Sequence, residues 1–262
     1  MPIGVFDSGV GGLTVMKEIT RLLPEENILY LGDTARVPYG TRSPGTVIRY
    51  SIENTLFLTS KRIKLLVVAC NTSSSVSLKQ LREKFPIPVI GVVGPGARAA
   101  VAVTKVKKVA VIGTETTINS GSYEKAIKEI DASVKITGVA CPLFVPLIEE
   151  GWLDGDVVRL TAEKYLSQIK GNGADTLVLG CTHYPMIKDI IADAVGIGLI
   201  DSAVETAKEV KHVLGDGNML RQSKKEGSRK FFVTDAPEKF ARTGERFLGE
   251  KISNISKIYL GG

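Results

Sequence analysis

Two cysteines occupy matching places in the two halves of this sequence. Cys70 ends the apolar run LLVVAC, Cys181 ends the apolar run TLVLGC, and a polar segment that predicts the start of a helix follows each. One thiol is enough for nucleophilic catalysis. Two thiols can also remove a proton from one face of a carbon atom and return a proton to the other face. The pair is therefore a candidate acid–base site.

Each of the two cysteines has a candidate partner. A thiol becomes a useful base when its pKa falls from about 8.5, which a helix N-terminus and an acid–base neighbour favour. His183 lies two residues after Cys181 and is one of two histidines in the chain. Asp7 ends a strand that we expect beside the strand of Cys70. The third cysteine, Cys141, has no polar neighbours, and we expect it to be buried and inert.

Two polar loops also follow predicted strands. DSGVGG, residues 7–12, matches the dinucleotide-binding pattern poorly, so we expect its glycines to bring backbone amides to a small anion, faced by Asp7 and Ser8. A purely structural turn is the alternative. In DTARVPYG, residues 33–40, Pro38 and Gly40 restrict the backbone around Tyr39 and predict a rigid wall of the site.

Short apolar runs alternate with longer amphipathic stretches, which predicts an α/β fold with mainly parallel sheets. The expected strands are residues 3–7, 28–33, 65–70, 89–93, 109–114, 136–141, 176–181, 197–201 and 230–235. The expected helices include residues 44–61, 121–130, 156–170 and 202–213. In such sheets ligands bind at the carboxyl ends of the strands, where both cysteines are placed.

The order of segments repeats along the chain. IGVFDS aligns with VAVIGT, so that Ser8 matches Thr114, and VVACNT aligns with VLGCTH, so that Cys70 matches Cys181. Two pseudo-symmetric α/β halves that face each other follow from this repeat. A cluster of chain-breaking residues, Gly94–Gly96, indicates the first boundary.

The composition narrows the class of protein. The 262 residues are 44% apolar, enough for a full core, and no run approaches the about 18 apolar residues of a membrane span. The net charge of +6 is scattered without interleaved aromatics, which argues against nucleic acid and suits a small anionic substrate. Three cysteines without a CxxC pair indicate a reducing compartment, so we expect a cytoplasmic protein.

Five segments together resemble the glutamate racemases in order and spacing, from about residue 3 to about residue 190: IGVFDSGVGG, GDTARVPYG, VVACNT, FVPLIEEG and LGCTHYP. The resemblance implies an isomerase that exchanges the α-proton of glutamate between two cysteines, without pyridoxal phosphate or a metal. Cys70 would act as base toward D-glutamate and Cys181 toward L-glutamate. Asp7 would assist Cys70, His183 would assist Cys181, and Glu149 would support His183.

The resemblance further implies an active site between two domains, residues 1–95 plus 210–262 and residues 96–209. Besides Asp7 and His183, the implied substrate contacts are Ser8, Pro38, Tyr39, Gly40, Asn71, Thr72, Thr114, Thr117 and Thr182. It also implies a homodimer and a supply of D-glutamate for peptidoglycan. Which of the adjacent acids Glu149 and Glu150 points inward stays open.

The sequence leaves three alternative functions open. The nearest is a racemase of aspartate or a related amino acid, although the PYG and DSGVGG segments favour glutamate. A zinc hydrolase could draw ligands from Cys70, Cys181, His183 and Asp7, but the usual zinc spacings are missing from the sequence. A two-lobed protein that binds an amino acid without chemistry is the third.

Overall fold

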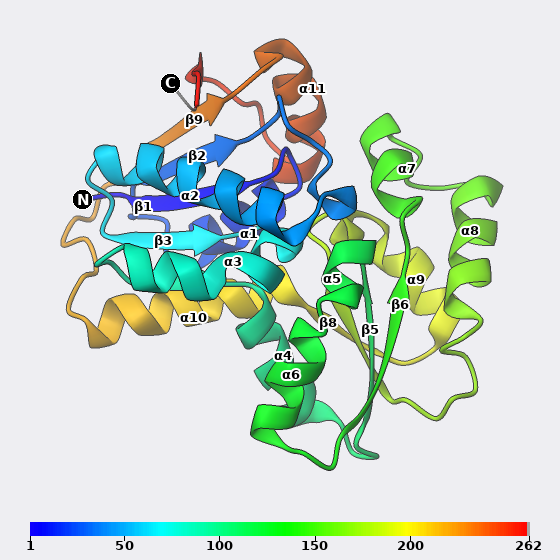
Figure 1. Ribbon diagram of the computed structural model, residues 1–262. Coiled ribbons are helices and arrows are strands. Elements are labelled where there is room, and N and C mark those ends of the chain that lie inside the picture. Colours follow the sequence, from blue (N-terminus) through cyan, green and yellow to red (C-terminus); the bar gives the residue numbers. More distant parts are fainter. Residues whose placement is uncertain (261–262) are drawn as a thin grey trace.

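The computed structural model describes residues 1–260 and contains two parallel β-sheets, each flanked by helices (Figure 1). The strand order is β10-β9-β2-β1-β3-β4 in the first sheet and β6-β5-β7-β8 in the second. Each pair of neighbouring strands runs parallel. The predicted α/β class is confirmed.

The strands are short and mostly apolar. They are β1 (Ile3–Asp7), β2 (Ile28–Gly32), β3 (Leu65–Val68), β4 (Val89–Gly91), β5 (Lys108–Gly113), β6 (Lys135–Ala140), β7 (Thr176–Gly180), β8 (Gly198–Asp201), β9 (Arg229–Val233) and β10 (Ile255–Lys257). The central strands β1, β3 and β7 are buried along their whole length because helices cover both faces of each sheet.

The helices connect these strands. They are α1 (Leu13–Leu22), α2 (Pro44–Ser60), α3 (Asn71–Lys84), α4 (Val93–Val103), α5 (Glu115–Asn119), α6 (Ser122–Ile130), α7 (Phe144–Glu150), α8 (Asp156–Leu166), α9 (Lys188–Val195), α10 (Ser202–Asp216) and α11 (Pro237–Leu248), with 3-10 turns η1 (Tyr39–Thr41) and η2 (Tyr184–Ile187). The predicted helices at 44–61, 121–130, 156–170 and 202–213 correspond to α2, α6, α8 and α10.

The predicted internal repeat is visible in the topology. The order β2-β1-β3-β4 in the first sheet has the same form as β6-β5-β7-β8 in the second. β1 pairs with β3, as expected for the strands of Asp7 and Cys70, and β5 pairs with β7 in the same way. Because all these strands are parallel, each half presents one edge of strand carboxyl ends to the other half.

Two sequence expectations differ from the structure. The short strand β10, which pairs with the outer side of β9, was not predicted, because three partly exposed residues give no apolar run. Cys181 is also not followed directly by an α-helix. Pro185 has no N–H to bond the carbonyl of Cys181, so the chain forms η2 first and α9 begins only at Lys188.

Strands from residues 3–91 and 229–257 form the first sheet, and strands from residues 108–201 form the second. The helix α10, which contains the expected boundary at 209/210, packs mainly against α1 of the first half. The limits of the two domains, residues 1–95 plus 210–262 and residues 96–209, stay predictions. Across residues 1–260, none of the helices combines the length and the apolar character needed to cross a membrane.

Candidate active site

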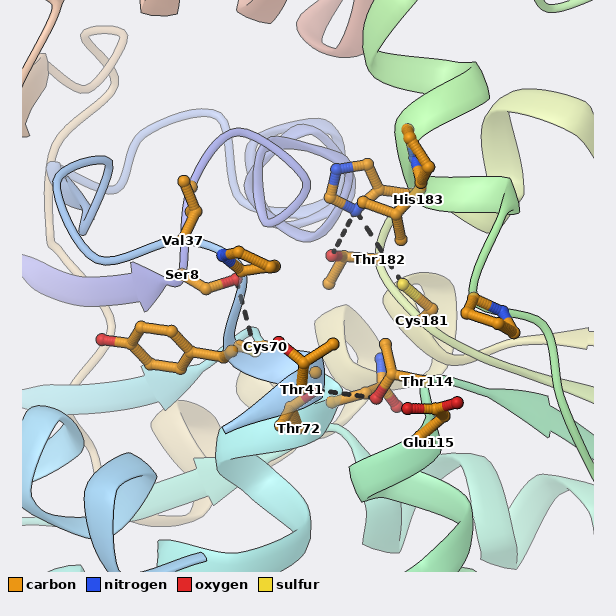
Figure 2. A pocket seen from close by; sticks show the side chains of 18 of the residues that line it. Ser8, Val37, Thr41, Cys70, Thr72, Thr114, Glu115, Cys181, Thr182 and His183 are labelled. Carbon is orange, nitrogen blue, oxygen red and sulfur yellow. Dashed lines mark hydrogen bonds between the residues drawn. The ribbon is translucent and has the colours of Figure 1, made fainter. Parts of the chain in front are cut away.

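A cavity of about 340 Å³ lies between the carboxyl ends of the two sheets, and both repeated cysteines line it (Figure 2). Cys70 follows β3 and Cys181 follows β7, and each thiol residue is only 5% exposed. The repeat in the sequence thus becomes two thiols, contributed by opposite halves, on one enclosed space.

Cys70 lies at the start of a helix, as predicted. It is the N-cap residue of α3, and its sulfur accepts a hydrogen bond from the backbone N–H of Ser73 at 3.5 Å. The thiol also lies 3.7 Å from the hydroxyl of Ser8. Burial and the nearby charge of Asp7 nevertheless raise the pKa of Cys70 to about 11. The expected lowering of this pKa is therefore wrong, because desolvation outweighs the helix N-terminus.

Asp7 lies behind the cavity rather than in its lining, fully buried at the end of β1. Its Oδ2 atom accepts a hydrogen bond from the backbone N–H of Gly9 at 2.8 Å, and among the described residues its Oδ1 atom has no hydrogen-bond partner. Burial raises the pKa of Asp7. A buried carboxyl with one free oxygen and a raised pKa is suited to accept and return a proton.

His183 links Cys181 to an acid on the second half. Its Nδ1 atom lies 3.9 Å from the sulfur of Cys181, and its Nε2 atom lies 3.1 Å from Oε1 of Glu149. Glu150 is exposed, so Glu149 is the inward carboxylate. Burial alone would lower the pKa of His183, but its contacts with Cys181 and Glu149 outweigh burial and raise the pKa to about 10. The imidazole therefore carries a proton at neutral pH.

The two thiols consequently have different surroundings. Cys70 has a helix N-terminus, a hydroxyl and a buried acid, whereas Cys181 has a protonated imidazole and only a 3-10 turn after it. The raised pKa keeps Cys70 protonated, which makes it the prospective acid. Cys181, with the imidazolium of His183 at 3.9 Å, is the prospective base.

Hydroxyl groups from both halves meet at the floor of the cavity. Thr72 Oγ1 lies 3.0 Å from Thr114 Oγ1, which in turn lies 3.0 Å from Thr117 Oγ1. Thr72 and Thr114 line the cavity, while Thr117 is buried behind them. Thr182 also lines the cavity, next to His183.

Asn71 supplies an amide at the same place. Its Oδ1 atom accepts a hydrogen bond from the hydroxyl of Tyr123 at 2.7 Å, which fixes the orientation of the side chain. The buried Nδ2 atom has no partner within residues 1–260. Because buried donors are normally paired, this N–H group indicates a ligand that carries an acceptor.

The predicted wall is formed by Pro38, Tyr39 and Gly40, which line the cavity. The peptide bond before Pro38 is cis. The hydroxyl of Tyr39 donates to Asp33 and accepts a hydrogen bond from Asn54 Nδ2 at 3.2 Å. These hydrogen bonds fix the aromatic ring of Tyr39, and the turn at residues 38–40 lies along the cavity.

Gly11 in the segment DSGVGG allows the close approach of the two halves. A Cβ atom on Gly11 would lie 2.3 Å from Thr182 Oγ1 and 2.5 Å from His183 Nδ1. Thr14, one helical turn on, donates a hydrogen bond to the carbonyl of Thr182 at 3.0 Å. This loop therefore packs directly against the Cys181 segment, which a side chain at Gly11 would push away.

Several lining residues were not predicted from the sequence. These are Gly9, Val37, Thr41, Glu115, Pro142, Val145 and Pro146. Pro142 to Pro146 follow the carboxyl end of β6, so the general rule for parallel sheets could have found them. Thr41 and Glu115 each directly follow a residue that was predicted.

Among residues 1–260, no lysine or arginine lines the cavity, so a bound carboxylate would depend on hydroxyl and N–H donors and on protonated His183. The zinc alternative needs at least three ligands around one point. Within the described part of the chain, no group of three or more His, Cys, Asp and Glu residues has that arrangement.

Comparisons with known proteins agree with this geometry. The family model described as Asp/Glu/Hydantoin racemase matches residues 3–210. A glutamate racemase of Geobacter metallireducens is 55% identical, over 98% of this chain and 96% of its own length. The crystal structure of a glutamate racemase from Bacillus anthracis superposes with a TM-score of 0.95 at 43% identity, covering 98% of this chain and 97% of that one.

A second solved structure, a glutamate racemase from Francisella tularensis in complex with D-glutamate, has a TM-score of 0.94 at 38% identity and covers 98% of this chain and 97% of its own. An aspartate racemase of Picrophilus torridus, at 18% identity and a TM-score of 0.61, shares the fold alone. By its sequence and its fold, this chain belongs to the glutamate racemases within the Asp/Glu/Hydantoin racemase family.

Proposed function

We propose that this protein interconverts L-glutamate and D-glutamate by a two-thiol mechanism that needs neither pyridoxal phosphate nor a metal. The observation that carries the proposal is the placement of Cys70 and Cys181, from opposite halves of a repeat, on one cavity. The Francisella tularensis relative, whose structure contains D-glutamate, supports the substrate.

In the direction from L-glutamate, Cys181 removes the α-proton and Cys70 delivers a proton to the opposite face. Cys70 carries the proton that this direction requires, because its pKa is raised to about 11. His183 then stabilises the negative charge that develops on the substrate as the α-proton leaves. The hydrogen bond to Glu149 holds the imidazole ring of His183 in place.

In the direction from D-glutamate, Cys70 must lose its proton before it can act as base. Asp7 is placed to take that proton, because its carboxyl has a raised pKa and a free oxygen. His183 passes its proton to Cys181, which then donates a proton to the other face. Two bases are required because the carbanion between the steps is nearly planar, and a single base would return the proton to the face it came from.

Binding of the substrate is assigned to the polar lining. The hydroxyls of Ser8, Thr72, Thr114 and Thr182 and the amide of Asn71 offer donors to the two carboxylates. The backbone of Pro38–Gly40 closes one side, and Thr117 fixes the hydroxyls that it touches. Such preorganised donors stabilise the negative charge that develops in the transition state.

Incubation of the protein with L- or D-glutamate in D₂O tests the proposal directly. We expect incorporation of α-deuterium and loss of optical activity, and we expect Cys70→Ala and Cys181→Ala to abolish racemisation. Full activity in either variant would remove the mechanism. Deuterium exchange with aspartate but not with glutamate would show that aspartate is the substrate. Stoichiometric zinc in the purified protein, together with loss of activity to a chelator, would favour a metal-dependent mechanism.

We further propose that the enzyme acts in the cytoplasm, as a homodimer, and supplies D-glutamate for peptidoglycan. The cytoplasmic location is supported by three cysteines that form no disulfide. Rescue of a D-glutamate auxotroph by expression of the chain tests the cellular role, and sedimentation equilibrium tests the dimer. A monomer at micromolar concentration, or failure of the rescue by an active protein, would contradict the respective proposal.

A further inference from the structure

The C-terminal helix α11 belongs to the first half but reaches the acid–base pair of the second half. The segment after residue 215 contains no recognised functional motif, yet α11 packs beside α1 and bonds to α7 through the side chain of Arg246. The helix α7 carries Glu149, and Glu149 binds His183. The connection between α11 and α7 therefore crosses between the halves at a residue that orients a prospective catalytic group.

The contact is made by Arg246. Its Nη2 atom donates a hydrogen bond to the backbone carbonyl of Glu149 at 2.7 Å. Glu149 is the last residue but one of α7, where carbonyl groups lack partners within the helix. A guanidinium at this end of a helix satisfies such a carbonyl and interacts favourably with the helix dipole.

A glycine at the end of α7 leaves space for the guanidinium group of Arg246. Gly151 ends α7 with φ of +85°, in the left-handed region, and a Cβ atom on it would lie 1.9 Å from Nη1 of Arg246. The glycine thus serves both the helix end and the close approach of the guanidinium.

Two more residues of α11 surround the same pair. The ring of Phe247 meets the ring of His183 edge to face, with centroids 5.2 Å apart. Lys239 lines a small cavity of about 80 Å³ together with Glu149, and its positive charge contributes, after the hydrogen bond and charge of His183, to a lowered pKa of Glu149. The helix α11 therefore contacts the imidazole of His183 and the backbone carbonyl of Glu149, and it places Lys239 beside the Glu149 side chain.

We propose that Arg246 is a positioning residue, which fixes the end of α7 so that Glu149 keeps His183 oriented toward Cys181. The inference rests on the proposed function, since it assumes that Cys181 and His183 transfer the proton of L-glutamate. Arg246 itself does not line the cavity and touches no reacting atom.

Primary isotope effects separate such a role from general support of the fold. With L-glutamate deuterated at the α-carbon, the labelled atom is removed at Cys181, and with deuterated D-glutamate it is removed at Cys70. If Arg246→Met slows only the Cys181 step, the isotope effect rises for the L-substrate and falls for the D-substrate. The value of kcat/KM falls equally in both directions, by about twofold to fivefold, since the equilibrium between enantiomers is fixed.

Arg242→Met is the matched control. Arg242 is also exposed on α11, and it makes no hydrogen bond or ion pair with any described residue. Arg246→Lys keeps the positive charge and one donor, so we expect it to restore part of the loss. The unfolding temperature of each variant measures whether the fold has changed, and the exposed position of Arg246 predicts little change.

Isotope effects that move in opposite directions in Arg246→Met alone would support the assignment. Unchanged isotope effects, or the same values as in Arg242→Met, would overturn it while the proposed function stands. A wild-type protein that neither racemises glutamate nor exchanges its α-proton would overturn the proposed function and this assignment together, which is a visibly different result.

Discussion

His183 and Glu149 form a hydrogen-bonded pair across 34 positions of sequence, with 3.1 Å between Nε2 and Oε1. The pair turns the other ring nitrogen of His183 toward Cys181 and contributes to the raised pKa of the imidazole, about 10. Cys70 has no histidine at its side and is buried beside an acid instead. The two halves therefore share a topology but control their thiols by different means.

Replacement of Glu149 by glutamine should move the alkaline limit of activity. Loss of the carboxylate lowers the pKa of His183, and a function that needs the imidazolium is present below this pKa and lost as the pH rises through it. We therefore expect the alkaline limb of kcat/KM to move to lower pH, with about tenfold less activity near pH 8. Initial rates followed by circular dichroism measure it between pH 6 and 10.5, a range that extends about half a unit beyond the ordinary and the raised pKa of histidine.

The neighbouring Glu150→Gln provides the control, because Glu150 has the same charge and an exposed side chain. Its pH profile should coincide with that of the unmodified protein. A Glu149→Gln profile with an unmoved alkaline limb would show that His183 does not depend on this carboxylate.

Alkylation by iodoacetamide should reach Cys181 before Cys70, although both residues are 5% exposed. With its pKa raised to about 11, Cys70 is a thiolate in about one molecule per thousand at pH 8. The sulfur of Cys181 has the protonated ring of His183 beside it instead of a buried acid. Mass spectrometry of peptides after short exposure measures the order of labelling.

The rate at Cys70 should rise about tenfold per pH unit up to its pKa. Cys141 should stay unlabelled in the folded protein, since it is 0% exposed and burial raises its pKa to about 12. Labelling of Cys70 ahead of Cys181 at pH 8 would contradict the assignment of Cys70 as acid and Cys181 as base.

Thr116 should affect substrate binding although it does not line the cavity. Its hydroxyl crosses from α5 to η1 and donates to the carbonyl of Gly40 at 2.8 Å, which ties the wall to the second half. Thr116→Val removes this bond with little change of shape, so we expect KM to rise about threefold with a smaller change of kcat.

Thr116→Ser should keep the binding constant near that of the parent, because it retains the hydroxyl. Thr161→Val is a suitable control, since the hydroxyl of Thr161 bonds only the carbonyl of Val157 on its own helix. Equal KM values in Thr116→Val and Thr161→Val would rule out the tie.

The connection at residues 215–229 should depend on a buried ion pair. Lys64 Nζ lies 2.6 Å from Glu26 Oε2 and donates to the carbonyl of Met219 at 2.7 Å, with side chains 5% and 2% exposed. Lys64→Met leaves the carboxylate buried without its cation, which should lower the free energy of unfolding by about 3 kcal/mol or more. Urea denaturation followed by tryptophan fluorescence and far-ultraviolet circular dichroism measures it.

Lys84→Met, at an exposed position of α3, should leave the urea midpoint nearly unchanged. The double variant Glu26→Gln with Lys64→Met should be more stable than Lys64→Met alone, because no unpaired charge remains. A double variant that is less stable than both single variants would count against this account of the pair.

Much of the fold could be read from the sequence because its signals are local. A buried parallel strand needs an apolar run of a few residues, and all nine runs that we identified form strands. The repeat placed Cys70 and Cys181 at strand ends without any knowledge of contacts. The failures occur where the local signal is weak: the three-residue β10, and the turn after Cys181, where Pro185 prevents a continuous helix.

The sequence by itself thus determined the fold class, the repeat and the identity of the prospective thiols. Only the tertiary structure decided that Glu149 rather than Glu150 faces His183, that burial keeps Cys70 protonated, and that Arg246 reaches α7 from the C-terminal helix. The reason is physical: strands and turns follow from neighbours along the chain, whereas desolvation and charge–charge contacts depend on residues that only packing brings together.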